Sequence, residues 1–162
     1  MSESHFLYPS TLFVSDNSNW IITILGSCVA VCLHDPVLRM GGMNHYMLPY
    51  WNGNGLASPK FGNIAIEKLI DEMLKRGSKK SSLKAKVFGG GRITSSNTNP
   101  YNISQRNISI AETLLTEHGI PVISSSVGGN QGRKIQLNPV TGEVLHKFIV
   151  PGKYVTMTQY GK

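Results

Sequence analysis

Two residues, Cys28 and His45, could together carry out nucleophilic chemistry on a carbonyl group. Cys28 directly follows the tight turn Gly26-Ser27, where a thiol can face solvent while backbone N–H groups converge beside it. Acyl chemistry needs this arrangement of a nucleophile next to an oxyanion hole. His45 lies on the glycine-rich segment 41–48. An antiparallel return of that segment would bring its imidazole alongside Cys28, where it could take the thiol proton.

The second cysteine, Cys32, is interpreted differently. It lies within a purely apolar run, where a cysteine usually serves as a small buried hydrophobe. On one strand the two cysteines would be about 13 Å apart, at about 3.3 Å per residue, which is too far for a disulfide. A working thiol–imidazole pair predicts that Cys28 is alkylated at a lower pH than an ordinary thiol, with Cys32 spared. A helix N-terminus at Cys28 would also lower the pKa of its thiol.

A third group is needed to orient the imidazole and fix its tautomer. No carboxylate is obvious for this role, because Asp35 falls in a predicted turn and the other nearby acids fall on the solvent face of a predicted helix. Thr23 is the hydroxyl candidate, although threonine is common in strands for its β propensity alone.

Other chemistries find little support. The cysteines and histidines lack zinc-site spacing. The glycine clusters 89–91 and 128–132 match neither a P-loop nor a dinucleotide fingerprint, so they predict tight turns or close backbone approach. The formal net charge of +7 suits an acidic partner, but the basic cluster has no interleaved aromatics of the kind that stack on single-stranded nucleic acid. We therefore expect no metal, no cofactor and no nucleic-acid partner.

The length of 162 residues and 40% hydrophobic content predict a single domain over 1–162, with residues 1–10 loosely ordered. No apolar run approaches the roughly 20 residues that cross a bilayer, and no secretory signal is visible. A cytoplasmic location without membrane insertion is the expectation.

Residue patterns predict two helices and several strands around the candidate pair. The helices are expected at 58–76, with Ser58 as N-cap, and at 104–118. Strands are expected at 20–25, 29–33, 41–48, 85–88, 122–126, 134–137, 144–150 and 154–157. Many strands with two clear helices indicate a layered α/β protein with antiparallel sheet content.

The linked cysteine and histidine segments, Leu25 to Pro36 and Gly41 to Pro49, closely resemble CheD, the family of chemoreceptor glutamine deamidases of bacterial chemotaxis. Later landmarks of that family follow in the same order, so the resemblance covers about residues 20–150. These landmarks are Lys60 to Asn63, Lys86 to Gly91, Ile103 to Asn107, and Gly128 to Arg133.

The resemblance implies an α/β protein of the α+β type, a layered α/β/β sandwich with mixed, largely antiparallel sheets and two main helices. It places the nucleophile on Cys28 and the catalytic histidine on His45, with Gly26 and Ser27 as oxyanion or supporting positions. The activity implied is that of a protein-glutamine glutaminase. Such an enzyme hydrolyses glutamine side chains of methyl-accepting chemoreceptor cytoplasmic domains to glutamate and releases ammonia. A CheC-type phosphatase is the further partner implied.

Two positions depart from the family pattern. The family threonine, six positions before the cysteine, falls on Ile22, and Thr23 comes one residue later. Because neighbouring strand residues face opposite sides, three explanations are open: a bulge or register shift brings Thr23 round, another polar group such as Ser27 helps, or His45 is held more weakly. The second departure is Ser126, where the family often has an acidic residue.

Two other functions remain alternatives. One is a regulatory binding module with this fold that acts on a CheC-type phosphatase with weak or no catalysis. The other is a different cysteine amidohydrolase, such as a protease-like or transamidating enzyme. Release of ammonia without peptide cleavage separates deamidation from proteolysis.

Overall fold

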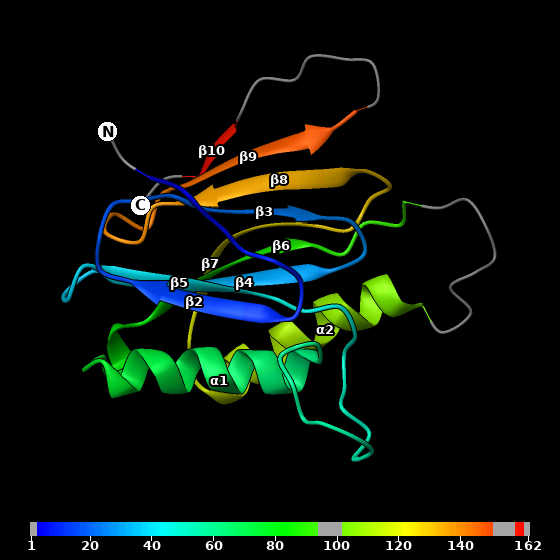
Figure 1. The fold of residues 1–162 in the computed structure, drawn as a ribbon, viewed down its shortest axis with the longest axis horizontal. Coiled ribbons are helices and arrows are strands. Elements are labelled where there is room, and N and C mark those ends of the chain that lie inside the picture. The colour runs from blue at the N-terminus through cyan, green and yellow to red at the C-terminus, as the bar shows by residue number, and fades with distance from the viewer. Residues whose placement is uncertain (1–2, 94–101, 151–157, 161–162) are drawn as a thin grey trace.

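The computed structural model describes residues 3–93, 102–150 and 158–160, and arranges them in three layers. Two five-stranded sheets pack face to face, and two helices cover the outer face of one of them (Figure 1). This is the α/β/β arrangement of the expected fold class, which is confirmed.

The helix-covered sheet, here called sheet B, has the strand order β2-β5-β4-β6-β7. Its strands are Thr11–Ser15 (β2), Met40–His45 (β5), Val29–Asp35 (β4), Lys84–Gly89 (β6) and Val122–Val127 (β7). The other sheet, sheet A, has the order β1-β3-β8-β9-β10. Its strands are His5–Phe6 (β1), Ile21–Leu25 (β3), Gly132–Leu137 (β8), Val144–Ile149 (β9) and Thr158–Tyr160 (β10). The pairs β1–β3 and β6–β7 are parallel and the other pairs are antiparallel.

The apolar sequence of strand β4 fits the position of sheet B between the helices and sheet A. Its apolar run does not alternate with polar residues, as is typical of a strand that is covered on both faces. Val29, Val31 and Leu33 pack toward the helices. Ala30 and Cys32 pack between the two sheets, so the interpretation of Cys32 as a buried core residue is confirmed.

The helices are α1 (Gly62–Lys75) and α2 (Ile103–Glu117), and a short 3-10 helix, η1 (Lys80–Ser82), precedes β6. The predicted apolar stripe of helix α1, formed by Ala65, Leu69 and Met73, is buried in the core between this helix and sheet B. Ala111 and Leu115 of helix α2 are buried in the same core. The predicted positions of both helices are therefore confirmed, apart from the beginning of the first.

The first helix begins later than predicted. Residues 58–61 are tied to the end of the β5 segment instead, because the Met47 N–H donates to the Lys60 carbonyl and the Gly62 N–H donates to the Leu48 carbonyl. Phe61 therefore stays extended and is the N-cap, without a side-chain cap. The prediction of Ser58 as the N-cap is wrong.

The N-terminal residues also differ from expectation. We predicted a loosely ordered segment over 1–10, but from His5 onward the chain is bound to β3, with the Leu7 N–H donating to the Ile22 carbonyl. Leu7 is buried between the sheets. Strand β2, which the sequence reading missed, follows and pairs with β5. The strand predicted at 154–157 lies outside the described residues. Within the described chain, no helix is long and apolar enough to span a membrane.

Candidate active site

The β4–β5 hairpin brings Cys28 and His45 to one face of sheet B. Its register sets Cys32 opposite Met43, and an isolated bridge joins Val29 to Tyr46. In this register Cys28 and His45 are diagonal neighbours, a relation with a Cα spacing of about 7–8 Å. Cys28 packs against the cluster between the sheets, and His45 shares the face of Met43, which belongs to that cluster. The antiparallel return predicted from the sequence is confirmed.

Thr23 reaches His45 from the opposite sheet. Its Oγ1 lies 2.7 Å from His45 Nδ1, and both side chains are buried. No bulge or register shift is needed, because β3 pairs regularly with β8 and Thr23 is one of its inward-facing positions, with Ile21 and Leu25. The hydroxyl that contacts the imidazole is therefore Thr23. Ser27, the other hydroxyl considered, meets the rest of the site through its backbone carbonyl.

The same hydroxyl determines which ring nitrogen of His45 carries the proton. Thr23 Oγ1 donates its hydrogen to the Leu7 carbonyl at 2.7 Å, and a carbonyl can only accept. At Nδ1 the hydroxyl oxygen must then act as acceptor, so Nδ1 carries the proton. In the neutral ring the other nitrogen, Nε2, is left with its lone pair, which is the form that can act as a base.

Burial keeps both members of the pair neutral in the resting protein. It lowers the pKa of His45 to about 4. It also raises the pKa of the Cys28 thiol, an effect partly opposed by a hydrogen bond from the residue's own backbone N–H. Cys28 directly precedes strand β4 and does not lie at a helix N-terminus. The expectation of a thiol with a lowered pKa is therefore wrong for the unbound protein.

Asn107 of α2 holds both sides of the site and was not singled out as a functional residue from the sequence. Its Nδ2 donates to the Ser27 carbonyl at 3.1 Å and to the Met47 carbonyl at 3.0 Å. It therefore ties the turn before Cys28 to the residues after His45. The signal in the sequence is a polar residue one turn before Ala111, on the inward face of the helix.

This clamp also sets the direction of a backbone donor. In a trans peptide the C=O and N–H point in opposite directions. Because Asn107 draws the Ser27 carbonyl into the protein, the Cys28 N–H points the other way, toward its own thiol. An N–H so directed can donate to the oxyanion of a tetrahedral intermediate whose carbon is bonded to the Cys28 sulfur.

The glycine cluster 89–91 lies against the Cys28 turn as a wall. The Gly90 N–H donates to the Cys28 carbonyl and the Gly91 N–H donates to the Gly26 carbonyl. Gly89 has a φ of 112°, and a Cβ at that position would overlap the Cys28 carbonyl. The prediction that this cluster marks close backbone approach is confirmed.

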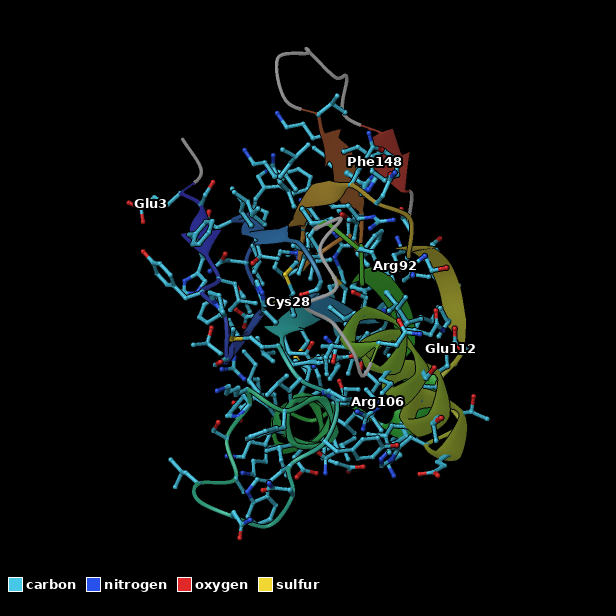
Figure 2. All side chains as sticks on the ribbon, turned by 90° about the vertical axis from the view of Figure 1, so that its right-hand side faces the viewer. Glu3, Cys28, Arg92, Arg106, Glu112 and Phe148 are labelled. Carbon is cyan, nitrogen blue, oxygen red and sulfur yellow. The ribbon has the colours of Figure 1, made fainter. Side chains whose placement is uncertain are left out.

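Apolar and cationic side chains lie on the side of the molecule that holds the Cys28 turn. The Ile93 side chain would touch a Cβ added at Gly26, and both Ile93 and Met47 are exposed. Figure 2 shows Cys28 at the end of the sandwich, with Arg92 and Arg106 on the same side of the molecule. Both arginines are exposed.

The remaining polar residues considered from the sequence lie elsewhere. Asp35 accepts a hydrogen bond from the Ser78 hydroxyl at 2.7 Å and caps its own turn. Ser126 lies beside His146 and accepts from Arg133 Nε at 3.1 Å, so it belongs to a separate buried cluster. Among the described residues, no group of three or more His, Cys, Asp or Glu side chains could hold a metal ion.

Comparison with known proteins identifies the family. The family model described as CheD chemotactic sensory transduction matches residues 47–148. A protein of Trichlorobacter lovleyi named "Probable chemoreceptor glutamine deamidase CheD" is 49% identical over 141 residues, covering 87% of this chain and 88% of the relative. A protein of the same name from Sulfurimonas denitrificans is 45% identical over 148 residues, covering 91% of this chain and 95% of the relative.

Among solved structures, the chain is similar to the hypothetical protein YfiH of Bacillus licheniformis. The TM-score is 0.46 and the sequence identity 18%, over 76% of this chain and 61% of the other.

The relatives define first a class, the proteins of bacterial chemotactic signalling. Within that class, this chain belongs to the CheD family. The segment matched by the family model begins after His45 and therefore does not include Cys28, His45 or Thr23.

Proposed function

We propose that this protein is a chemoreceptor glutamine deamidase. It hydrolyses glutamine side chains in the cytoplasmic domains of methyl-accepting chemoreceptors to glutamate and releases ammonia, and it acts in the cytoplasm where those domains lie. The names of its relatives support this activity. The observation that carries the mechanism is the chain of hydrogen bonds from the Leu7 carbonyl through Thr23 to His45, because it leaves His45 Nε2 as a base on the face that holds Cys28.

The first half of the reaction forms a thioester. As the Cys28 sulfur attacks the carboxamide carbon, its proton passes to His45 Nε2, so neither group has to be charged beforehand. The tetrahedral oxyanion accepts from the Cys28 N–H, and backbone groups of Gly26 and Ser27 support this turn. His45 then gives the proton from Nε2 to the departing nitrogen, which leaves as ammonia.

The second half releases the product. Nε2 takes a proton from water, whose oxygen attacks the thioester carbon, and the C–S bond breaks. The thiolate of Cys28 recovers its proton from His45. The receptor keeps a glutamate carboxylate, which adds one negative charge. No redox partner enters, and the atoms balance as one amide and one water giving one carboxylate and one ammonium after protonation.

The test is mass spectrometry of a chemoreceptor cytoplasmic fragment after incubation with this protein. We expect a mass increase of about 1 Da per glutamine converted to glutamate, with no peptide cleavage. Cys28→Ala and His45→Ala should abolish the conversion, whereas Cys32→Ala serves as the matched control and should retain it. If the wild type converts no glutamine while binding the fragment tightly, the deamidase proposal fails and the regulatory module takes its place.

Asn107 is proposed as a positioning residue for the oxyanion donor. Asn107→Asp keeps the shape but replaces the amide donor by a group that repels carbonyl oxygens, so kcat should fall by about 10- to 100-fold while KM changes little. The alkylation profile of Cys28 should also shift to higher pH, because its N–H no longer stabilises the thiolate. A lower stability with an unchanged alkylation profile would assign Asn107 a structural role only.

A CheC-type phosphatase is proposed as a second protein partner. The exposed side chains of Met47 and Ile93 near the Cys28 turn support a protein surface as the ligand of this region. A partner that binds there should compete with the receptor fragment, so adding a CheC-type phosphatase should slow deamidation. Equal rates with and without a bound phosphatase would place its binding elsewhere.

A further inference from the structure

A cavity of about 220 Å³ lies at the far end of strand β4 from Cys28. It is lined by Cys32 and His34 of β4, by Lys86 of β6, and by the turn between β8 and β9. Cys28 and His34 are six residues apart along an extended strand, which corresponds to about 20 Å. The cavity, here called the distal cavity, is therefore separate from the candidate active site.

The charged side chains that line the distal cavity are all basic, and two acids beyond the lining, Glu143 and Asp35, act electrostatically on Lys86 and His34. Arg39, Lys84 and Lys86 line it, and none of the described lining residues is acidic. Lys86 is 4% exposed, and its Nζ donates to the Gly142 carbonyl at 2.8 Å. It faces inward because it lies opposite Cys32 in the ladder between β4 and β6. A buried ammonium loses hydration, and Glu143 offsets part of that cost for Lys86. An anion in the cavity would add to this stabilisation, and it would also face Arg39 and Lys84.

The rest of the lining is apolar. Leu137 is buried, and Pro36, Ile123 and Val140 complete these walls. Binding sites for small molecules combine such walls with a few placed polar groups, and those for drug-sized ligands have volumes of about 300–1,000 Å³. At about 220 Å³, the distal cavity suits a smaller molecule.

The backbone at Arg39 adds an independent observation. Arg39 has a φ of 55°, in the left-handed region where glycine and asparagine are favoured and other residues are strained. The turn nevertheless carries an arginine, and that arginine lines the cavity. Strain of this kind points toward function.

We propose that the distal cavity binds a small organic anion, with a carboxylate or phosphate head beside Lys86, Lys84 and Arg39 and an apolar body against Leu137 and Ile123. This ligand is distinct from the receptor substrate, and the proposal does not rest on the deamidase activity.

The experiment is an NMR titration of the full ¹⁵N-labelled chain with phenyl phosphate, benzoate and phenol. Phenyl phosphate and benzoate represent the two anionic heads, and phenol is the uncharged analogue. We expect saturable shifts at the amides of Thr141, Gly142 and His34 with at least one anion, at a Kd of about 1 mM or below. The stronger of the two identifies the head group. Phenol should bind about tenfold more weakly than that anion.

Three variants test the assignment. Lys86→Met should weaken anion binding about tenfold or more, the usual effect of losing a hydrogen bond to a charged group. Arg39→Gly should weaken binding while leaving the thermal midpoint unchanged or higher, because glycine relieves the left-handed strain. Lys68→Met removes the same charge from the exposed side of α1 and should bind like the wild type.

Several results would overturn the proposal. One is the absence of saturable shifts up to about 10 mM of either anion, a range that covers weak metabolite sites. Equal binding of phenol would make the cavity a simple apolar site. Unchanged binding in both Lys86→Met and Arg39→Gly, or equal loss in Lys68→Met, would reduce the effect to general surface charge.

Discussion

The hydroxyl of Thr23 should control turnover without contacting the substrate, and Thr23→Val tests this. In the wild type, Thr23 Oγ1 lies 2.7 Å from His45 Nδ1 and 2.7 Å from the Leu7 carbonyl oxygen. Valine has nearly the same shape, but it can neither accept a hydrogen bond from His45 Nδ1 nor donate one to the Leu7 carbonyl. The variant therefore leaves two buried polar groups without these partners. It also removes the contact that places the proton on Nδ1 and keeps Nε2 available as the base.

The magnitude follows from these two hydrogen bonds. Each buried group left without its partner costs about 1–3 kcal/mol, so with two such groups the free energy of unfolding should fall by about 2–6 kcal/mol. If the orientation and tautomer of His45 lose about 2 kcal/mol of preference, kcat falls by about 30-fold, since each 1.36 kcal/mol is a factor of ten. Thr23 is fully buried, so KM should stay nearly constant.

The assay follows ammonia release from the receptor fragment across substrate concentrations, with urea unfolding in parallel to ensure that each variant is folded at the assay temperature. Thr23→Ser is the matched control, because it keeps the hydroxyl and loses only a methyl group. It should retain kcat within about threefold. The reasoning is refuted if Thr23→Val keeps wild-type kcat, or if Thr23→Ser loses as much activity as Thr23→Val.

Three further results are expected. Because burial raises the pKa of Cys28 and raises that of Cys32 to about 12, iodoacetamide labelling of Cys28 should increase through the alkaline range while Cys32 stays unmodified in the folded protein, and a labelling plateau below pH 7 would contradict this. Burial lowers the pKa of His45 and of His146 from 6.5 to about 4, so between these values the unfolded chain binds more protons. The free energy of unfolding should therefore be highest above pH 6.5 and fall as the pH drops toward 4, by at most about 3 kcal/mol per histidine, and equal urea midpoints at pH 7 and 5 would disprove it. Gly89→Ala should lower the free energy of unfolding by more than about 2 kcal/mol, because the methyl group would overlap the Cys28 carbonyl at a positive φ. A variant that melts at the wild-type temperature would contradict this, because it would show that the backbone at residues 89–91 can move away from the Cys28 turn without cost.

Local patterns predicted the parts of the fold whose signals lie within a single segment. The unbroken apolar run from Val29 to Leu33 predicts a strand, the stripe of α1 has helical spacing, and the structure has both elements. The beginning of α1 could not be predicted, because hydrogen bonds from residues 47–48 hold Phe61 extended. The N-terminal strand was missed because two residues that pair in parallel with β3 carry no periodic signal.

The same holds for the candidate site: the contacts within one hairpin could be predicted from the sequence, and the contacts between layers could not. Cys28 and His45 belong to one hairpin, so their shared face follows from strand alternation and a short connection. Thr23 and Asn107 come from the opposite sheet and from α2, and their contacts depend on how layers stack. The motif spacing pointed to Ile22, and only the packing of β3 against sheet B shows that Thr23 faces the imidazole.

The hydrogen bond from Thr23 to the Leu7 carbonyl connects turnover to the beginning of the chain. Leu7 follows a two-residue strand that is held by a few backbone hydrogen bonds to residues 20–22, and such edges open at a much lower free energy than the whole domain. Each opening removes the acceptor that keeps the Thr23 hydrogen away from His45. We therefore expect the protonation geometry of His45 to depend on a local opening equilibrium of this N-terminal strand. A fusion or truncation there should alter the fraction of catalytically competent molecules while the sheets and helices remain folded.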